Sequence, residues 1–80
     1  MRYFQKIVLM NIINPKKLFN SKWTAVTPVN KERHFIVSEI EFDEDDRVFA
    51  CCIEAVISKR STQINWHELK DDGRWAHGWY

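Results

Sequence analysis

The stretch RHFIVSEIEFDEDDRVFACCIEAVIS, residues 33–58, contains two runs rich in β-branched, aromatic and other apolar residues, separated by four acidic residues. Such runs, bounded by a polar turn, are typical of β-strands. The sequence therefore predicts strands over residues 33–42 and 47–58, joined into an antiparallel hairpin by the turn at residues 43–46.

The spacing of the apolar residues also predicts how the two strands pair. A four-residue turn places Phe42 opposite Arg47, and the same register places Ile36 opposite Ile53. This pairing brings apolar residues of both strands to one face, as the two-residue repeat of a strand requires. The opposite face is half apolar, so we expect it to be partly covered as well.

Shorter strands are expected on both sides of this hairpin. Residues 22–27 combine aromatic and β-branched residues and are followed by Pro28, which cannot donate to a β-ladder. After a second turn, residues 62–66 form the last strand, with Trp66 opposite Ile53 on the core face. The predicted fold class is therefore mainly β, a four-stranded antiparallel meander that could curl into a small barrel.

Two short helical turns are expected outside the strands. Near residues 15–19, Asn14 can cap the first turn. Pro15 suits the first helical position because proline lacks an N–H group, and that group would have no partner in the helix at this position. Near residues 67–71, Asn65 can cap in the same way. Residues 3–13 show no clear period and could form an edge strand, a short helix or a flexible leader.

The chain contains four tryptophans, and each can bury a large apolar area. Trp23 and Trp66 lie within expected strands, so we expect them in the core. Trp75 and Trp79 belong to an aromatic C-terminal tail, residues 74–80, which has no clear strand pattern. These two rings could lie in the core or on the surface.

Length and composition indicate one small domain over residues 12–80, preceded by an N-terminal extension, residues 1–11. The extension has no signal-peptide cleavage pattern and is too short to span a bilayer, so we expect a cytoplasmic protein with no membrane partner. Met10 is an alternative start to Met1. The net charge of +1 gives no overall bias towards nucleic acid, but acidic residues cluster at 39–46, so the surface could be dipolar.

No pattern in the sequence predicts an enzyme, a cofactor or a metal site. Cys51 and Cys52 are adjacent, so a strand directs their side chains to opposite faces. The spacing of cysteines and histidines does not fit a zinc site, and no glycine-rich phosphate loop is present. We therefore expect no catalytic residues, no cofactor and no metal.

Several short motifs agree together in type and spacing with a known family. They are residues 14–18, 21–26 and 33–35, residues 69–71 after Trp66, and the pairs Arg74-Trp75 and Gly78-Trp79. By these motifs the chain resembles an uncharacterised family of small tryptophan-rich bacterial proteins, a domain of unknown function. The likeness covers about residues 12–79. It implies a bacterial cytoplasmic protein and brings no activity with it.

We expect a non-enzymatic binding module. Small sheets that bind single strands combine exposed aromatic side chains with basic ones, which favours RNA or single-stranded nucleic acid as the partner, including a ribosome-associated role. The alternative is a protein–protein adaptor or small accessory subunit that uses the same aromatic tail, because Trp, Tyr and Arg are enriched in interaction hot spots. The candidate binding surface consists of Lys16, Lys17, Lys22, Lys59, Arg60, Arg74, Trp75, Trp79 and Tyr80.

Overall fold

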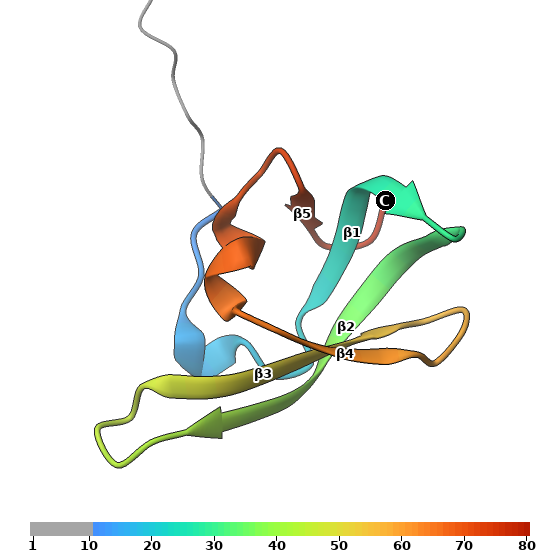
Figure 1. Cartoon of the computed structure of the whole chain (residues 1–80). Helices are drawn as coiled ribbons and strands as arrows, with labels where there is room; N and C mark the ends of the chain where they lie inside the picture. Colours follow the sequence, from blue (N-terminus) through green and yellow to red (C-terminus); the bar gives the residue numbers. More distant parts are fainter. Residues whose placement is uncertain (1–10) are drawn as a thin grey trace, which may run out of the picture.

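The central hairpin of the computed structural model, which describes residues 11–80, consists of β2 (Glu32–Phe42) and β3 (Val48–Ala55) (Figure 1). β1 (Lys22–Val29) pairs with the free edge of β2, and β4 (Ser61–Ile64) pairs with the free edge of β3. All of these neighbours run antiparallel. The expected antiparallel meander of four strands is therefore present.

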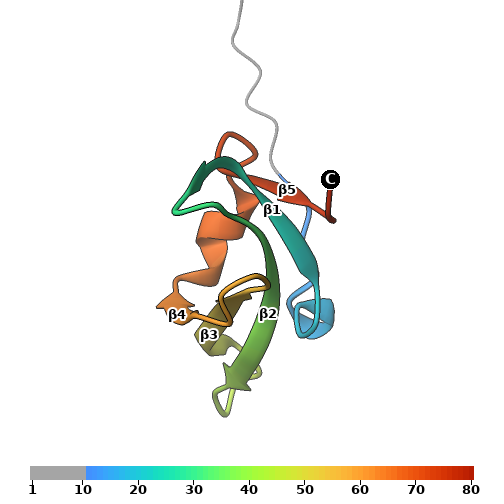
Figure 2. The ribbon, with the colours of Figure 1, turned by 90° about the vertical axis from the view of Figure 1, so that its right-hand side faces the viewer.

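The aromatic tail contributes a fifth strand. β5 (Trp75–His77) pairs antiparallel with β1 and completes one sheet in the order β4-β3-β2-β1-β5 (Figure 2). The mainly β fold class is confirmed, with one strand more than expected, and the sheet is open between its edge strands rather than closed into a barrel. Two 3₁₀ helices, η1 (Pro15–Lys17) and η2 (Trp66–Lys70), lie outside the sheet, and η2 contacts β3 and β5.

The register of the central hairpin differs from the prediction by one residue at Phe42 and over residues 35–37, and by two residues over residues 39–41. Val37, not Ile36, lies opposite Ile53, and Phe35 lies opposite Ala55. A one-residue offset turns every side chain of a strand to the other face, so Phe35 and Val37 are buried in place of Ile36. The predicted core face of this part of β2 is therefore wrong, and the reason is that both of its faces are apolar.

Part of this offset arises at the acidic turn, and the part that exchanges the faces of residues 35–37 arises between Val37 and Glu39. The backbone N–H of Asp43 donates to the carbonyl of Arg47 at 2.8 Å, and the Asp43 carboxylate accepts hydrogen bonds from the backbone N–H groups of Asp45 and Arg47. Phe42 consequently pairs with Val48 rather than with Arg47. Two irregularities of register, of the kind that a β-bulge produces, occur within the same hairpin.

The hairpin between β3 and β4 is displaced by four residues from the prediction. β3 ends at Ala55, where the chain turns back and the N–H of Lys59 donates to the Ala55 carbonyl at 2.8 Å. Ile64 therefore lies opposite Cys51 instead of Ala55. A displacement by an even number keeps Ile64 on the same face, but β4 ends there, so Trp66 begins η2 instead of extending the strand.

Both expected helical turns are present, as 3₁₀ helices. The side chain of Asn14 accepts a hydrogen bond from the backbone N–H of Lys16 at 3.0 Å, and the side chain of Asn65 accepts one from the N–H of His67, also at 3.0 Å. Each asparagine thus satisfies a backbone donor that the first turn leaves unpaired. The second turn begins at Trp66, one residue earlier than expected.

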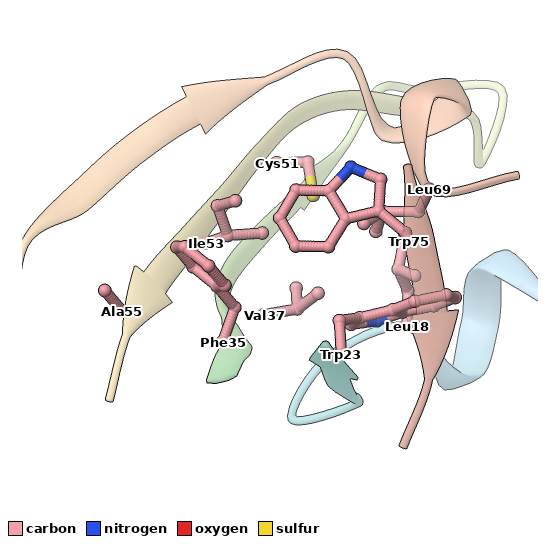
Figure 3. Close-up of a cluster of buried hydrophobic side chains, with 9 residues drawn as sticks. All are labelled: Leu18, Trp23, Phe35, Val37, Cys51, Ile53, Ala55, Leu69 and Trp75. Carbon is pink, nitrogen blue, oxygen red and sulfur yellow. The ribbon is translucent and has the colours of Figure 1, made fainter. Parts of the chain in front are cut away.

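The core lies on one face of the sheet, which we call the core face (Figure 3). Its buried residues are Leu18, Trp23, Phe35, Val37, Cys51, Ile53, Ala55, Leu69 and Trp75. The rings of Phe35 and Trp75 meet edge to face, with centroids 5.1 Å apart, and the indole of Trp23 stacks on the imidazole of His77 at 4.5 Å. Trp23 and Trp75 are therefore core residues. Trp66 is half-buried and packs against the margin of this core from η2, so its predicted place on a strand opposite Ile53 is wrong.

Candidate nucleic-acid interface

The residues that follow β5 are held against β1. The N–H of Gly78 donates to the carbonyl of Lys22 at 2.7 Å. The buried hydroxyl of Thr24 donates to the carbonyl of Gly78 at 2.7 Å and accepts from the N–H of Tyr80 at 3.1 Å. Gly78 has a φ of +98°, a conformation that favours glycine. Residues 78–80 therefore have a defined position on the sheet.

Trp79 lies across the first two strands on the face opposite the core, which we call the outer face. Its indole Nε1 donates to the backbone carbonyl of Phe35 at 2.9 Å, which holds one edge of the ring. The Lys22 Nζ lies 5.4 Å from the ring centroid, and the His34 ring lies at 5.8 Å. The residue remains 42% exposed, so part of the indole is open to a ligand.

Tyr80 is held by its backbone while its side chain is 73% exposed. Its carbonyl oxygen accepts from Arg33 Nε at 3.2 Å and from His34 Nε2 at 2.8 Å, so His34 carries the hydrogen on Nε2. Two aromatic rings, two basic side chains and an imidazole are thus brought together from three segments of the chain. We call this group, Lys22, Arg33, His34, Trp79 and Tyr80, the tail patch.

Arg60, a predicted contact residue, is paired with a carboxylate of the protein itself. Its guanidinium forms a salt bridge with the buried carboxylate of Glu32, and the Ser58 hydroxyl donates to the same carboxylate. The hydrogen bonds from Arg60 and then from Ser58 lower the pKa of Glu32 to about 2, and the carboxylate in turn raises the pKa of Arg60. The charge of Arg60 is therefore already balanced within the protein.

Arg74 and Trp75 also differ from the expected surface. The Arg74 guanidinium lies 3.4 Å from the Glu68 carboxylate, on the exposed side of η2. Arg74 borders a hollow of about 250 Å³ that Arg60 and Trp75 also line. Because Trp75 itself is buried, it cannot stack on a ligand, and we leave it out of the candidate surface.

The remaining predicted cations lie apart from one another. Lys16 and Lys17 belong to η1, and Lys16 borders a hollow with Phe42 and Asp46 beside the acidic turn. Figure 1 shows η1 and this turn at one end of the molecule, at the lower left, whereas the β1–β2 turn, the β3–β4 turn with Lys59, and the C-terminus lie at the other end. The nine predicted residues therefore do not form one surface.

Arg33 and His34 were missed by the sequence analysis. Both contact Tyr80, which is 47 and 46 residues away in the chain. Their sequence signals are a basic pair at the start of a strand and their place in the family motif at residues 33–35. The contact itself depends on β5 pairing with β1, which no local pattern in the tail predicts.

The two cysteines occupy opposite faces, and the pKa of each thiol is raised. Burial raises the pKa of Cys51 to about 11, and burial together with Glu39 and Glu41 raises the pKa of Cys52. Raised values keep both thiols protonated, whereas a nucleophilic cysteine needs a lowered one. Within residues 11–80, no three histidine, cysteine or acidic side chains are grouped as metal ligands.

None of the helices within residues 11–80 is long and apolar enough to cross a bilayer.

Comparison with known proteins gives one match. The model of a family described as Tryptophan-rich protein (DUF2389) matches residues 21–80, from the residue before β1 to the tail patch. The matched segment starts later than the likeness seen in the motifs, so residues 14–18 lie outside it. No curated protein and no solved structure matches the chain. Because the match covers most of the sequence, the protein belongs to this tryptophan-rich family, whose function is unknown.

Proposed function

We propose that this protein is a non-enzymatic cytoplasmic module that binds RNA or other single-stranded nucleic acid through the tail patch. The observation that carries the proposal is the pair of exposed rings, Trp79 and Tyr80, held beside the cationic side chains of Lys22 and Arg33. Proteins that bind single strands combine aromatic stacking platforms with cations that follow the phosphates. The tail patch brings both elements together in space.

The tail patch is also organised before any ligand arrives. Trp79 is held by its hydrogen bond to Phe35, and Tyr80 is held through its backbone by Thr24 and His34. Binding to groups that are already ordered loses less conformational entropy. Each base that stacks on such a ring contributes about 1–3 kcal/mol.

The geometry favours single strands over duplexes. Stacking on Trp79 or Tyr80 requires a base whose face is free, and bases in a duplex are stacked on one another. Loops and bulges of folded RNA present such bases, so a ribosome-associated role is one form of this proposal. No cofactor takes part in it.

Fluorescence anisotropy with labelled single-stranded RNA, single-stranded DNA and duplex DNA of mixed sequence tests the proposal. We expect Trp79→Ala to weaken single-strand binding about tenfold, in keeping with the loss of one stacked base. The double variant K22Q/R33Q should weaken binding and reduce its dependence on salt, because fewer phosphates are neutralised. K16Q/K17Q removes the same charge at the other end of the molecule and should bind as the wild type does.

Absence of single-strand binding by the wild type at low salt would overturn the proposal, as would equal losses in the two double variants. The alternative, a protein adaptor that uses the same rings, is tested by affinity capture from a bacterial lysate with and without nuclease. A protein partner that remains bound after nuclease treatment and is lost with Trp79→Ala would favour the adaptor.

A further inference from the structure

A second surface lies at the end of the molecule opposite the tail patch. The β2–β3 hairpin extends past the strands that flank it, because β4 pairs with β3 only as far as Cys51 and the β1 side meets β2 only as far as Val37. Figures 1 and 2 both show this extension reaching away from the rest of the sheet. We call residues 38–50 the acidic arm.

Beside the acidic arm, the chain leaves a hollow of about 640 Å³ where β4 ends and η2 begins. Phe49 and Ala50 line it from the arm, and Ile64, Trp66 and His67 line it from the other side. Phe49 is 61% exposed, although a phenylalanine on a free surface loses the stabilisation that burial gives. The hollow is therefore a place where an apolar side chain could be buried between two aromatic rings.

The indole of Trp66 already interacts with a cation on its own chain. The Lys70 Nζ lies 4.9 Å from the centroid of the Trp66 ring, within the range of a cation–π contact. This contact places one positive charge beside the hollow, and the carboxylates of the acidic arm outnumber it.

The acidic arm beside this hollow is strongly negative. It contains six acidic residues against the single basic residue Arg47, whereas Glu68 in the lining of the hollow is paired with Arg74. Such a surface repels nucleic acid, and it would also repel the acidic arm of a second copy. It is complementary to a basic segment of another protein.

We propose that the acidic arm and this hollow form a docking site for a segment of a partner protein in which apolar and basic residues alternate. An apolar side chain of the segment packs between Phe49 and Trp66, and the flanking lysines or arginines face the carboxylates of the arm. This site is separate from the tail patch, so one molecule can hold a nucleic acid at one end and a protein at the other.

The test uses three labelled peptides of about eight residues, the length of an ordinary strand, in fluorescence anisotropy with the full chain. The first alternates lysine with leucine, the second lysine with serine and the third glutamate with leucine. We expect measurable binding of the lysine–leucine peptide only. Phe49→Ser should weaken that binding about tenfold, because a large apolar contact is lost at an exposed position where the fold does not depend on it.

A matched pair of charge reversals locates the site. Glu41→Lys should weaken binding more than Asp72→Lys, which changes the net charge equally in the turn before β5. In ¹⁵N–¹H spectra, the peptide should shift the backbone signals of Phe49 and His67 and the indole signal of Trp66. The proposal is overturned if the lysine–serine peptide binds as tightly, if the two charge reversals act equally, or if the shifts fall on the tail patch.

Discussion

The two ends of this sheet are built in different ways. The tail patch is assembled from segments far apart in the chain, and hydrogen bonds to Thr24, Phe35 and His34 hold it in place. The acidic arm consists of one continuous hairpin whose turn is closed by Asp43 alone. One end depends on the tertiary fold for its shape, and the other depends on local sequence.

The charges differ in the same way. The arm carries its acidic residues in one run of sequence, from Glu39 to Asp46. The basic residues outside the arm come from separate turns and strands. The fold brings Lys22 and Arg33 into the tail patch. It pairs Arg60 with Glu32 and Arg74 with Glu68. A nearly neutral net charge therefore conceals an acidic run in the arm, and the basic residues are distributed over both ends, since Lys16 lies beside the acidic turn.

The largest expected effect is on the free energy of unfolding. It distinguishes a buried residue of the tail from an exposed residue of the arm. Trp75→Ala should lower the free energy of unfolding by about 3–5 kcal/mol, because it removes a large ring from the core. Phe49→Ala, in the arm, should change it by less than about 0.5 kcal/mol, since that side chain is exposed. Urea unfolding followed by tryptophan fluorescence measures both.

Similar losses in these two variants would contradict the division between the ends. They would mean that the arm is part of the cooperative core and that Phe49 is held by contacts as extensive as those of Trp75.

The next effect concerns how the tail is attached. Thr24→Val removes the hydroxyl that donates to Gly78 and accepts from Tyr80, and leaves these two backbone groups without that partner. We expect a loss of about 1–3 kcal/mol, and faster amide hydrogen exchange at Tyr80. Thr27→Val, at an exposed position of the same strand, is the control and should change neither quantity.

Unchanged exchange at Tyr80 in the Thr24 variant would show that other contacts suffice to hold residues 78–80. The tail patch would then be more robust than its hydrogen bonds indicate, and Trp79 would be the next residue to test.

The smallest effect is a dependence of stability on pH, which arises from the salt bridge between Glu32 and Arg60. The pKa of Glu32 in the fold is about 2, below its ordinary value of 4.5, so the stabilisation by its pairing with Arg60 is fully present above about pH 4.5 and is lost as the pH falls towards 2. Glu32→Gln should melt at a lower temperature than the wild type at pH 7, and the two should converge across that acidic range. Thermal melts at several pH values measure this difference.

Glu44→Gln, in the acidic turn, is the matched control because it removes one carboxylate from the other end. It should follow the pH profile of the wild type. The acid-sensitive group would lie in the arm if the melting temperature of the Glu44 variant, and not that of the Glu32 variant, converged with that of the wild type at low pH.

Local features were predictable from the sequence. The alternation in residues 33–58 indicated the central hairpin, and Asn14 and Asn65 indicated both helical turns because a cap acts within its own first turn. The register was not predictable, because β2 is apolar on both faces near Phe35 to Val37, and a bulge between Val37 and Glu39 turns Phe35 and Val37 inward. The candidate site was predicted only in part: Lys22, Trp79 and Tyr80 are together, whereas Arg33 and His34 were not foreseen.

The sequence by itself determined the mainly β class, the antiparallel order of the first four strands, the family and the acidic run of the arm. These properties depend on residues close together in the chain, where periodicity and capping act. Only the tertiary structure decided that Trp75 is core and Trp79 is surface, although only three residues lie between them in the same tail. The physical reason is that β5 pairs with β1, which turns Trp75 to the core face, and that Gly78 then redirects the chain and brings Trp79 to the outer face.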